Sequence, residues 1–178
     1  VIYDAAHCTG VKYRNQTIGS FGNISMFSFH ATKIFNTIEG GALTYQDETL
    51  KRKIYLLKNF GIANENEIIL PGTNGKMNEF QAAMGLLNLE LVENEIVKRK
   101  ERFLLYKELL SNIEGLTFMK YQQGTDPNYQ YFPIIIDSKK FGRTRDSLNR
   151  EMRNFNVIPR KYFHPIASKY AFLQKESI

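Results

Sequence analysis

Two side chains near the start of the sequence have the chemistry of a covalent cofactor site. Asp4 follows the apolar run Val1–Tyr3, which predicts a β-strand, and Lys33 follows a second predicted strand, Ser25–Phe29. Ligands of open α/β sheets usually bind where strands end. A carboxylate and a lysine at such ends, with small residues nearby in Glu39–Gly41, form the layout that pyridoxal phosphate (PLP) requires: the lysine forms a Schiff base and the carboxylate pairs with the pyridine nitrogen. Spacing alone, however, favours an ordinary surface salt bridge between the two.

The elements that must position these residues alternate between strands and helices. The apolar runs Val1–Tyr3, Ser25–Phe29 and Gly41–Tyr45 predict strands, and the stretch Leu50–Lys58 predicts a helix. This alternation is typical of an α/β layer, which we assign to residues 1–77.

A longer helical pattern follows and predicts a bridging helix over residues 78–114. Asn78 is suited to cap its beginning and Gly115 to end it. The apolar positions share one stripe, and the charged run Lys98–Arg102 is interpreted as a solvated face. The members of the stripe are Phe80, Ala83, Met84, Leu87 and Leu91, continued by Phe103, Tyr106 and Leu110.

Residues 115–178 predict a small α+β domain. Leu116–Tyr121 and Tyr131–Ile136 are expected strands, separated by the turn-rich segment Gly124–Asn128. Thr144–Asn154 is an expected helix, with Leu148, Met152 and Phe155 facing inward, and Val157–Pro159 is an expected edge strand because proline cannot donate to a ladder.

Composition limits the class of protein. The 178 residues carry 24 Lys and Arg against 18 Asp and Glu, 43% are hydrophobic, and the balance excludes collagen, intrinsic disorder and a disulfide scaffold. The lone Cys8 allows no intrachain disulfide and indicates a reducing cytoplasm; no apolar run has the length of a membrane span, and no signal peptide leads the sequence. The abrupt start at Val1 suggests a fragment.

The excess of positive charge lies entirely near the C-terminus. Residues 138–178 hold 10 of the basic side chains and three of the acidic ones. Such a region suits an anionic partner, either a phosphorylated small molecule or nucleic acid, or is simply a solvated surface. No nucleic-acid-binding motif accompanies it, so we expect no nucleic-acid partner. We assign no metal ligands.

Several spaced motifs resemble, in order, those of the DegT/DnrJ/EryC1/StrS family of sugar aminotransferases. The resemblance implies an aspartate aminotransferase-like fold (PLP fold type I), of which this chain would hold part of the large domain and the small C-terminal domain. The motifs are Val1–His7, Gly19–Gly22, Phe27–Lys33, Glu39–Ala42, Asn59–Gly61 and Gly72–Ala83, with weaker similarity at the Tyr131 strand and at Arg160–Pro165.

The same resemblance implies roles for individual residues. Lys33 matches the lysine that binds PLP and then shuttles a proton, and its presence favours transamination because related sugar dehydratases have histidine there. Asp4 would keep the pyridine nitrogen protonated, His7 would lie near the ring, and Ser28 would contact the phosphate. Asn74 resembles a residue that reaches the cofactor of the partner subunit, which implies a homodimer with shared active sites.

The resemblance also implies the reaction. Family substrates are nucleotide-linked keto sugars, here a 3- or 4-keto-6-deoxy sugar, with glutamate as the expected amino donor in a glycan pathway. Lys76 stands where the family commonly has arginine, and Arg160, Tyr162 and His164 lie in a substrate-side stretch, although they suit a surface role equally well. The alternative is a non-catalytic relative or regulator that binds a sugar nucleotide. Because the family's remaining PLP-domain elements precede the aspartate strand, we expect this chain alone to be inactive.

Overall fold

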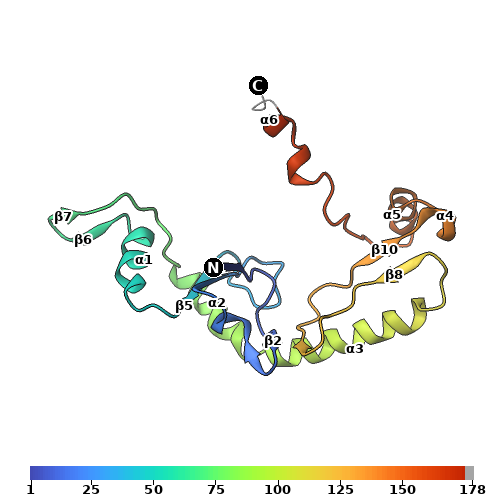
Figure 1. Cartoon of the computed structure of the whole chain (residues 1–178), viewed down its shortest axis with the longest axis horizontal. Coiled ribbons are helices and arrows are strands. Elements are labelled where there is room, and N and C mark those ends of the chain that lie inside the picture. Colours follow the sequence, from blue (N-terminus) through green and yellow to red (C-terminus); the bar gives the residue numbers. More distant parts are fainter. Residues whose placement is uncertain (175–178) are drawn as a thin grey trace. The chain divides into compact units, whose positions relative to one another are not determined.

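The computed structural model describes residues 1–174, and the chain divides into two compact units. The first unit comprises Val1–Leu104 and Tyr121–Tyr131; the second comprises Leu105–Lys120 and the described residues from Phe132 onward. Figure 1 traces the chain through both units. The segment 121–131, which follows the start of the second unit in sequence, thus returns to the first.

A three-stranded sheet organises the first unit. Its order is β1 (Ile2–Asp4), β4 (Ile24–Ser28) and β5 (Gly41–Tyr45). β1 and β4 are parallel, with Asp4 opposite Met26, whereas β4 and β5 are antiparallel, with Ser28 opposite Gly41. The ends of β1 and β4 and the beginning of β5 therefore meet at one edge of the sheet.

A second small sheet contains a segment that the sequence predicts as a turn. β2 (Lys12–Tyr13) pairs with β3 (Gln16–Thr17) on one side and with β9 (Thr125–Asp126) on the other. A 3-10 helix, η1 (Ile18–Ser20), follows β3. The expectation that Gly124–Asn128 is only a turn is wrong, because β9 pairs with a strand more than a hundred residues earlier.

The predicted helix Leu50–Lys58 is confirmed as α1 with the same bounds. Its buried Leu56 accepts, through its carbonyl, a hydrogen bond from the Gly61 amide at 2.7 Å. The hairpin of β6 (Ile62–Asn64) and β7 (Glu67–Ile68) follows and lies beside α1 in Figure 1.

The predicted bridging helix is two helices. α2 (Glu79–Leu89) begins at the predicted cap, Asn78, which forms a reciprocal capping box with Gln81. The Leu91 amide then bonds the Asn88 carbonyl, three residues back, which breaks the helical spacing before α3 (Val92–Leu110) begins. The predicted stop at Gly115 is wrong, because the helix ends at Leu110 and Gly115 lies in the turn that precedes the next strand.

The second unit pairs two strands in antiparallel fashion beside the end of α3 (Figure 1). β8 (Leu116–Phe118) pairs with β10 (Ile134–Ile136) along its whole length, with Leu116 opposite Ile136. Aromatic rings pack against them: Phe132 lies 5.4 Å from both Tyr106 and Phe118, measured between ring centroids. The helices that follow are α4 (Ser138–Phe141), α5 (Arg145–Arg153), η2 (Ala167–Lys169) and α6 (Ala171–Gln174).

Two expectations in the second unit need correction. Phe155 is 80% exposed, because α5 ends at Arg153 and the chain then turns away through Asn156, which has a positive φ of 58°. Val157–Pro159 forms no strand; the Pro159 carbonyl instead accepts a hydrogen bond from the Asn149 side chain at 2.8 Å. The expected helix Thr144–Asn154 is found as α5, and Thr144 caps its beginning by accepting a hydrogen bond from the Ser147 amide.

Candidate active site

The predicted cofactor residues follow strands that end at the same sheet edge. Asp4 is the last residue of β1 and Ser28 the last of β4, while the loop from Phe29 to Gly40 returns the chain to β5. Close approach at this edge requires glycine, because a Cβ on Gly41 would lie 2.7 Å from the Phe27 carbonyl oxygen. The sheet therefore brings the carboxylate and the lysine loop, 29 residues apart in sequence, to one place.

Lys33 and His7 are in direct contact at this edge. The Lys33 Nζ lies 3.1 Å from the His7 Nε2, and both side chains are half-buried. Asp4 begins the loop that carries His7, and its carboxylate accepts a hydrogen bond from the Ala6 amide at 3.1 Å. These three residues form the group that we call the lysine cluster: Asp4, His7 and Lys33.

The electrostatics of the lysine cluster favour a neutral imidazole. Burial lowers the pKa of His7, the positive charge of Lys33 lowers it further, and the carboxylate of Asp4 opposes both. A neutral imidazole can accept a hydrogen bond at Nε2, so His7 is suited to accept one from Lys33 Nζ. Burial raises the pKa of the neighbouring Cys8 thiol, which keeps it protonated and poorly nucleophilic.

The loop that carries Lys33 is fixed to the sheet and to α2. The buried Thr37 donates its amide to the Phe29 carbonyl and its hydroxyl to the Glu39 carbonyl, at 2.9 and 2.7 Å. On the helix side, Asn88 donates its side-chain amide to the Asn36 carbonyl at 2.9 Å. Lys33 thus projects from a loop anchored on two sides.

Ser28 and His30 lie at the root of this loop. The Ser28 hydroxyl oxygen is 3.4 Å from the His30 amide. The His30 ring contacts the Thr32 hydroxyl at 2.8 Å and lies 3.6 Å from the Glu39 carboxylate. His30, to which the sequence assigns no role beyond proximity, therefore links two parts of the lysine loop.

A segment far along the sequence, residues 128–131, also supports the lysine cluster. Asn128 and Gln130, both buried, hydrogen-bond the loops on which His7 and Lys33 lie, and the Tyr131 ring lies 5.0 Å from the His7 ring. Arg99, expected on a solvated face, is half-buried and donates to the Gln130 carbonyl at 3.3 Å. The sequence signals here are the turn-forming composition of Gly124–Asn128 and the weaker similarity at the Tyr131 strand, and neither indicates that this segment reaches the lysine cluster.

Asn74 and Lys76 lie in a different part of the first unit. Asn74 pairs with Asn59 in an isolated bridge, and the Lys76 ammonium lies 4.3 Å from the centre of the Phe60 ring. Within residues 1–174, neither makes a hydrogen bond or ion pair with Lys33. The structure of one chain therefore does not bring them into the lysine cluster.

The other three candidate substrate residues, Arg160, Tyr162 and His164, belong to the second unit. The Tyr162 and Phe163 rings stack with centroids 3.9 Å apart, the Arg160 guanidinium lies 5.3 Å from the Phe163 ring, and His164 is exposed. Lys161 pairs with Asp146 at 3.0 Å, which ties this segment to α5.

Comparison with known proteins bears directly on this arrangement. The sequence matches the profile of the DegT/DnrJ/EryC1/StrS aminotransferase family over residues 1–177. The chain belongs to this family. The sequence resemblance is thereby confirmed, and it extends through the second unit as well as the first.

Characterised members of the family are similar over nearly the whole chain. A dTDP-4-amino-4,6-dideoxy-D-glucose transaminase of Shigella dysenteriae is 40% identical over 93% of this chain and 45% of its own length. A GDP-perosamine synthase of Caulobacter vibrioides is 30% identical over 100% of this chain and 49% of its own length. The chain thus spans about half the length of the curated relatives it matches.

Solved structures of family members share the fold. DesI, solved in the presence of its TDP-sugar product, is 33% identical and superimposes with a TM-score of 0.89 over 97% of this chain and 44% of that one. PseC of Helicobacter pylori, an aminotransferase of pseudaminic acid biosynthesis, gives 27% identity and a TM-score of 0.89 over 99% and 48%. The predicted α/β fold of the aspartate aminotransferase-like, fold type I enzymes is confirmed.

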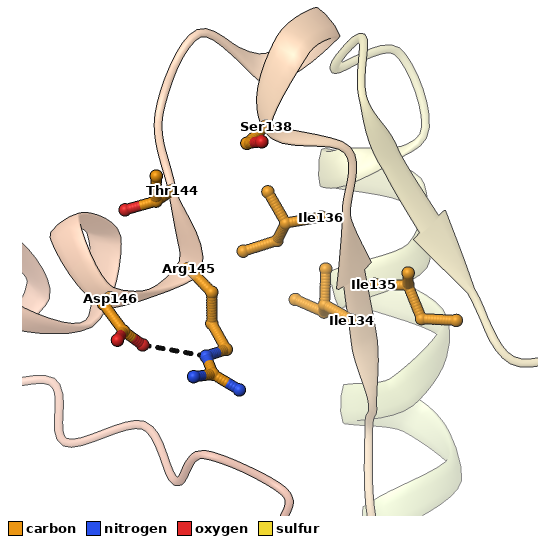
Figure 2. Close-up of a pocket in the computed structure, with 7 residues that line it drawn as sticks. All are labelled: Ile134, Ile135, Ile136, Ser138, Thr144, Arg145 and Asp146. Atoms are coloured by element: carbon orange, nitrogen blue, oxygen red, sulfur yellow. Dashed lines mark hydrogen bonds and ion pairs between the residues drawn. The ribbon is translucent and has the colours of Figure 1, made fainter. Parts of the chain in front are cut away.

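A pocket of about 610 Å³ lies within the second unit, between β10 and the start of α5 (Figure 2). Ile134 and Ile136 point into it while Ile135 points away, as alternation along a strand requires. Arg145 donates to Asp146 across 2.9 Å at its wall. Its lining is Ile134, Ile135, Ile136, Ser138, Thr144, Arg145 and Asp146, none of which is a predicted site residue of the family.

Among residues 1–174, no helix is long and apolar enough to cross a bilayer.

The chemistry of the lysine cluster fits PLP. Lys33 supplies a primary amine for the aldehyde, and Asp4 a carboxylate for the pyridine nitrogen. The half-buried contact between Lys33 and the neutral imidazole of His7 gives the amine a hydrogen-bond acceptor. The Ser28 hydroxyl at the same sheet edge is suited to an anionic phosphate oxygen.

Proposed function

We propose that this chain carries the catalytic lysine of a PLP-dependent aminotransferase that acts on a nucleotide-linked 3- or 4-keto-6-deoxy sugar. The observation that carries the proposal is the 3.1 Å contact between Lys33 and His7 at the strand edge where Asp4 also lies. The relatives support the substrate class, because their names describe transaminases and synthases of dTDP- and GDP-linked amino sugars.

In this proposal each residue of the lysine cluster has a defined task. PLP supplies an electrophilic aldehyde and an electron-withdrawing ring, which together allow an amino group to be transferred. Lys33 holds the cofactor through Nζ and, once released from it, moves a proton at the substrate carbon. Asp4 keeps a proton on the pyridine nitrogen, and His7 accepts a hydrogen bond from Lys33.

The remaining residues complete the proposed site. Ser28 donates to the phosphate, and Asn74 reaches the cofactor of the partner subunit in a homodimer. Lys76, Arg160, Tyr162 and His164 bind the substrate, where cationic groups suit its diphosphate. Lys76 replaces the planar fork of arginine with a point charge, so it would contact phosphate less directionally.

Further parts of the proposal concern the reaction's setting. Glutamate is the amino donor, the product enters a glycan pathway, and the enzyme acts in the cytoplasm, where the lone Cys8 stays reduced. We propose the domain division suggested by the sequence, with the PLP domain over residues 1–77 and the small domain from residue 115 onward, apart from residues 121–131, which belong to the first compact unit.

The test is trapping of the cofactor on Lys33. The full-length protein, incubated with PLP, should acquire a visible absorption band; borohydride should remove it and leave a pyridoxyl group on the Lys33 peptide, detected by mass spectrometry. Lys33→Ala should abolish the label, whereas Lys53→Ala, at an exposed position of α1, should retain it. A Lys33→Ala protein that keeps full transaminase activity would refute the assignment.

Substrate class is tested separately with the amino form of the full-length enzyme. Offered a panel of keto sugar nucleotides, it should return to the aldehyde form with only one or a few of them. Binding of a sugar nucleotide without any half-reaction with glutamate would instead identify the non-catalytic, regulatory alternative.

A further inference from the structure

One extended segment, Asn128–Tyr131, contacts both loops of the lysine cluster. It lies about a hundred residues beyond them in sequence, yet belongs to the same compact unit. Its contacts reach the loop after β1, which carries His7, and the loop after β4, which carries Lys33. Side chains of this segment make hydrogen bonds to both of these loops.

Asn128 holds the first loop by two hydrogen bonds. Its Nδ2 donates to the carbonyls of His7 and Thr9, at 2.9 and 2.8 Å, and the residue is only 5% exposed. Its Oδ1 accepts from the Gln130 amide at 3.1 Å. Only the side-chain oxygen of Asn128 can accept from the Gln130 backbone amide, so the side chain has one orientation. Both protons of its NH2 group are therefore directed at the loop that carries His7.

Gln130 holds the second loop. Its Oε1 accepts from the amide of Ile34, the residue after Lys33, at 3.4 Å, and Gln130 is 9% exposed. Its carbonyl accepts from Arg99 on α3 at 3.3 Å, which fixes the segment to a helix. The next residue, Tyr131, places its ring 5.0 Å from the ring of His7.

We propose that Asn128 and Gln130 are positioning residues that set the distance between Lys33 and His7 by holding the two loops from a common segment. The proposal rests on the proposed function only for the role of Lys33. The hydrogen bonds of both side chains to these loops go to backbone atoms, so each acts through the backbone of the loops.

The sheet alone is not sufficient to set this distance. β1 ends at Asp4, three residues before His7, and β4 ends at Ser28, five residues before Lys33. Both reactive groups thus lie on loops, and a displacement of about 1 Å in such a constellation lowers a rate by up to roughly 100-fold. Buried side-chain amides that bond the backbone of these loops restrict how far Lys33 and His7 can move apart.

The experiment compares Asn128→Leu with a matched control, Asn149→Leu, in the full-length protein. Asn149 is also a buried asparagine, 8% exposed, and donates its side-chain amide to the Pro159 carbonyl, but in the second unit. The first readout is the NMR titration of the His7 imidazole, assigned with His7→Gln. The second is the rate at which borohydride traps PLP on Lys33.

Asn128→Leu should raise the pKa of His7 toward its ordinary value, because the loop that buries it beside Lys33 is released. It should also slow trapping by about 10- to 100-fold. Asn149→Leu should leave both unchanged while lowering the melting temperature comparably. Equal effects of the two variants on either readout, or an unchanged His7 titration in folded Asn128→Leu, would overturn the proposal.

A second pair of variants covers failure of Asn128→Leu to fold. Gln130→Leu removes only the acceptor for Ile34, and Gln130→Glu retains an oxygen there. The first should slow trapping and the second should restore it; equal trapping in both would overturn the proposal for Gln130. A wild-type protein that takes up no PLP on Lys33 would refute the proposed function, whereas the His7 titration would still decide the positioning role.

Discussion

A single methyl group added to α2 tests how rigidly the lysine loop is held. Gly85 is buried in the middle of α2, where alanine would ordinarily stabilise a helix by about 1 kcal/mol. In this structure a Cβ at Gly85 would lie 2.9 Å from the Thr37 Cγ2, closer than such atoms approach. Thr37 is 1% exposed and its hydroxyl bonds the Glu39 carbonyl, so it cannot turn away without losing that bond.

The expected result follows from comparing the two effects. Overpacking a well-filled site typically costs about 1–3 kcal/mol. The middle of that range, about 2 kcal/mol, exceeds the gain of about 1 kcal/mol in helix propensity. Gly85→Ala should therefore lower the free energy of unfolding by about 1 kcal/mol. Thr37→Ser removes the opposing methyl group, at a cost of about 1 kcal/mol for the lost packing. In that background Gly85→Ala should stabilise by up to about 1 kcal/mol, a coupling of about 2 kcal/mol.

Urea unfolding of the four proteins of this cycle, followed by circular dichroism, measures the coupling. Thr37→Ser retains the hydroxyl that bonds Glu39, so it isolates the methyl contact. Additive changes, or stabilisation by Gly85→Ala in the wild-type background, would show that α2 and the lysine loop do not pack as the structure has them.

Three further predictions concern titration and capping. Because folding lowers the pKa of His7, the unfolded chain binds more protons than the folded chain at mildly acidic pH. The free energy of unfolding should therefore fall as the pH drops from about 6.5, the unfolded pKa, through the lower pKa of the folded state. Urea midpoints measured against pH should show this fall, and the profile of His7→Gln should be flatter. The pKa of Asp146 is lowered to about 2 by hydrogen bonds from Arg145 first and Lys161 second, so carboxylate NMR should find it raised more by Arg145→Met than by Lys161→Met. Asn78→Ala removes the capping box of α2 and should lower the unfolding free energy by about 1 kcal/mol, whereas an unchanged urea midpoint would contradict the cap.

The sequence predicts those elements whose signals are local. The bounds of α1, the cap at Asn78 and the strand Gly41–Tyr45 follow from periodicity and capping chemistry within a few residues of each other. The edge that collects Asp4 and Lys33 follows from strand order, since parallel neighbours end on the same side.

The features that sequence reasoning misses depend on distant partners. The break between α2 and α3 has neither proline nor glycine to mark it, and β9 is two residues whose partner, β2, lies in another part of the chain. Val157–Pro159 has the composition of an edge strand but finds no strand to pair with, because Asn149 binds the Pro159 carbonyl instead. Pairing is a property of the whole fold, and local composition does not specify it.

The lysine cluster combines both kinds of determinant. β1 and β4 are adjacent strands, about 5 Å apart, so the sheet starts the two loops that follow them from neighbouring positions. The first of these loops buries little of its own beyond Ala5, so apolar packing alone does not fix where His7 lies. Its carbonyls are instead bound by Asn128, 121 residues away from His7 in sequence. A chain shortened before residue 121 would keep the three strands and the bonds that anchor the lysine loop through Thr37 and Asn88, but it would lose the two bonds that hold the loop of His7. The contact between Lys33 and His7 would then be fixed from the side of Lys33 alone.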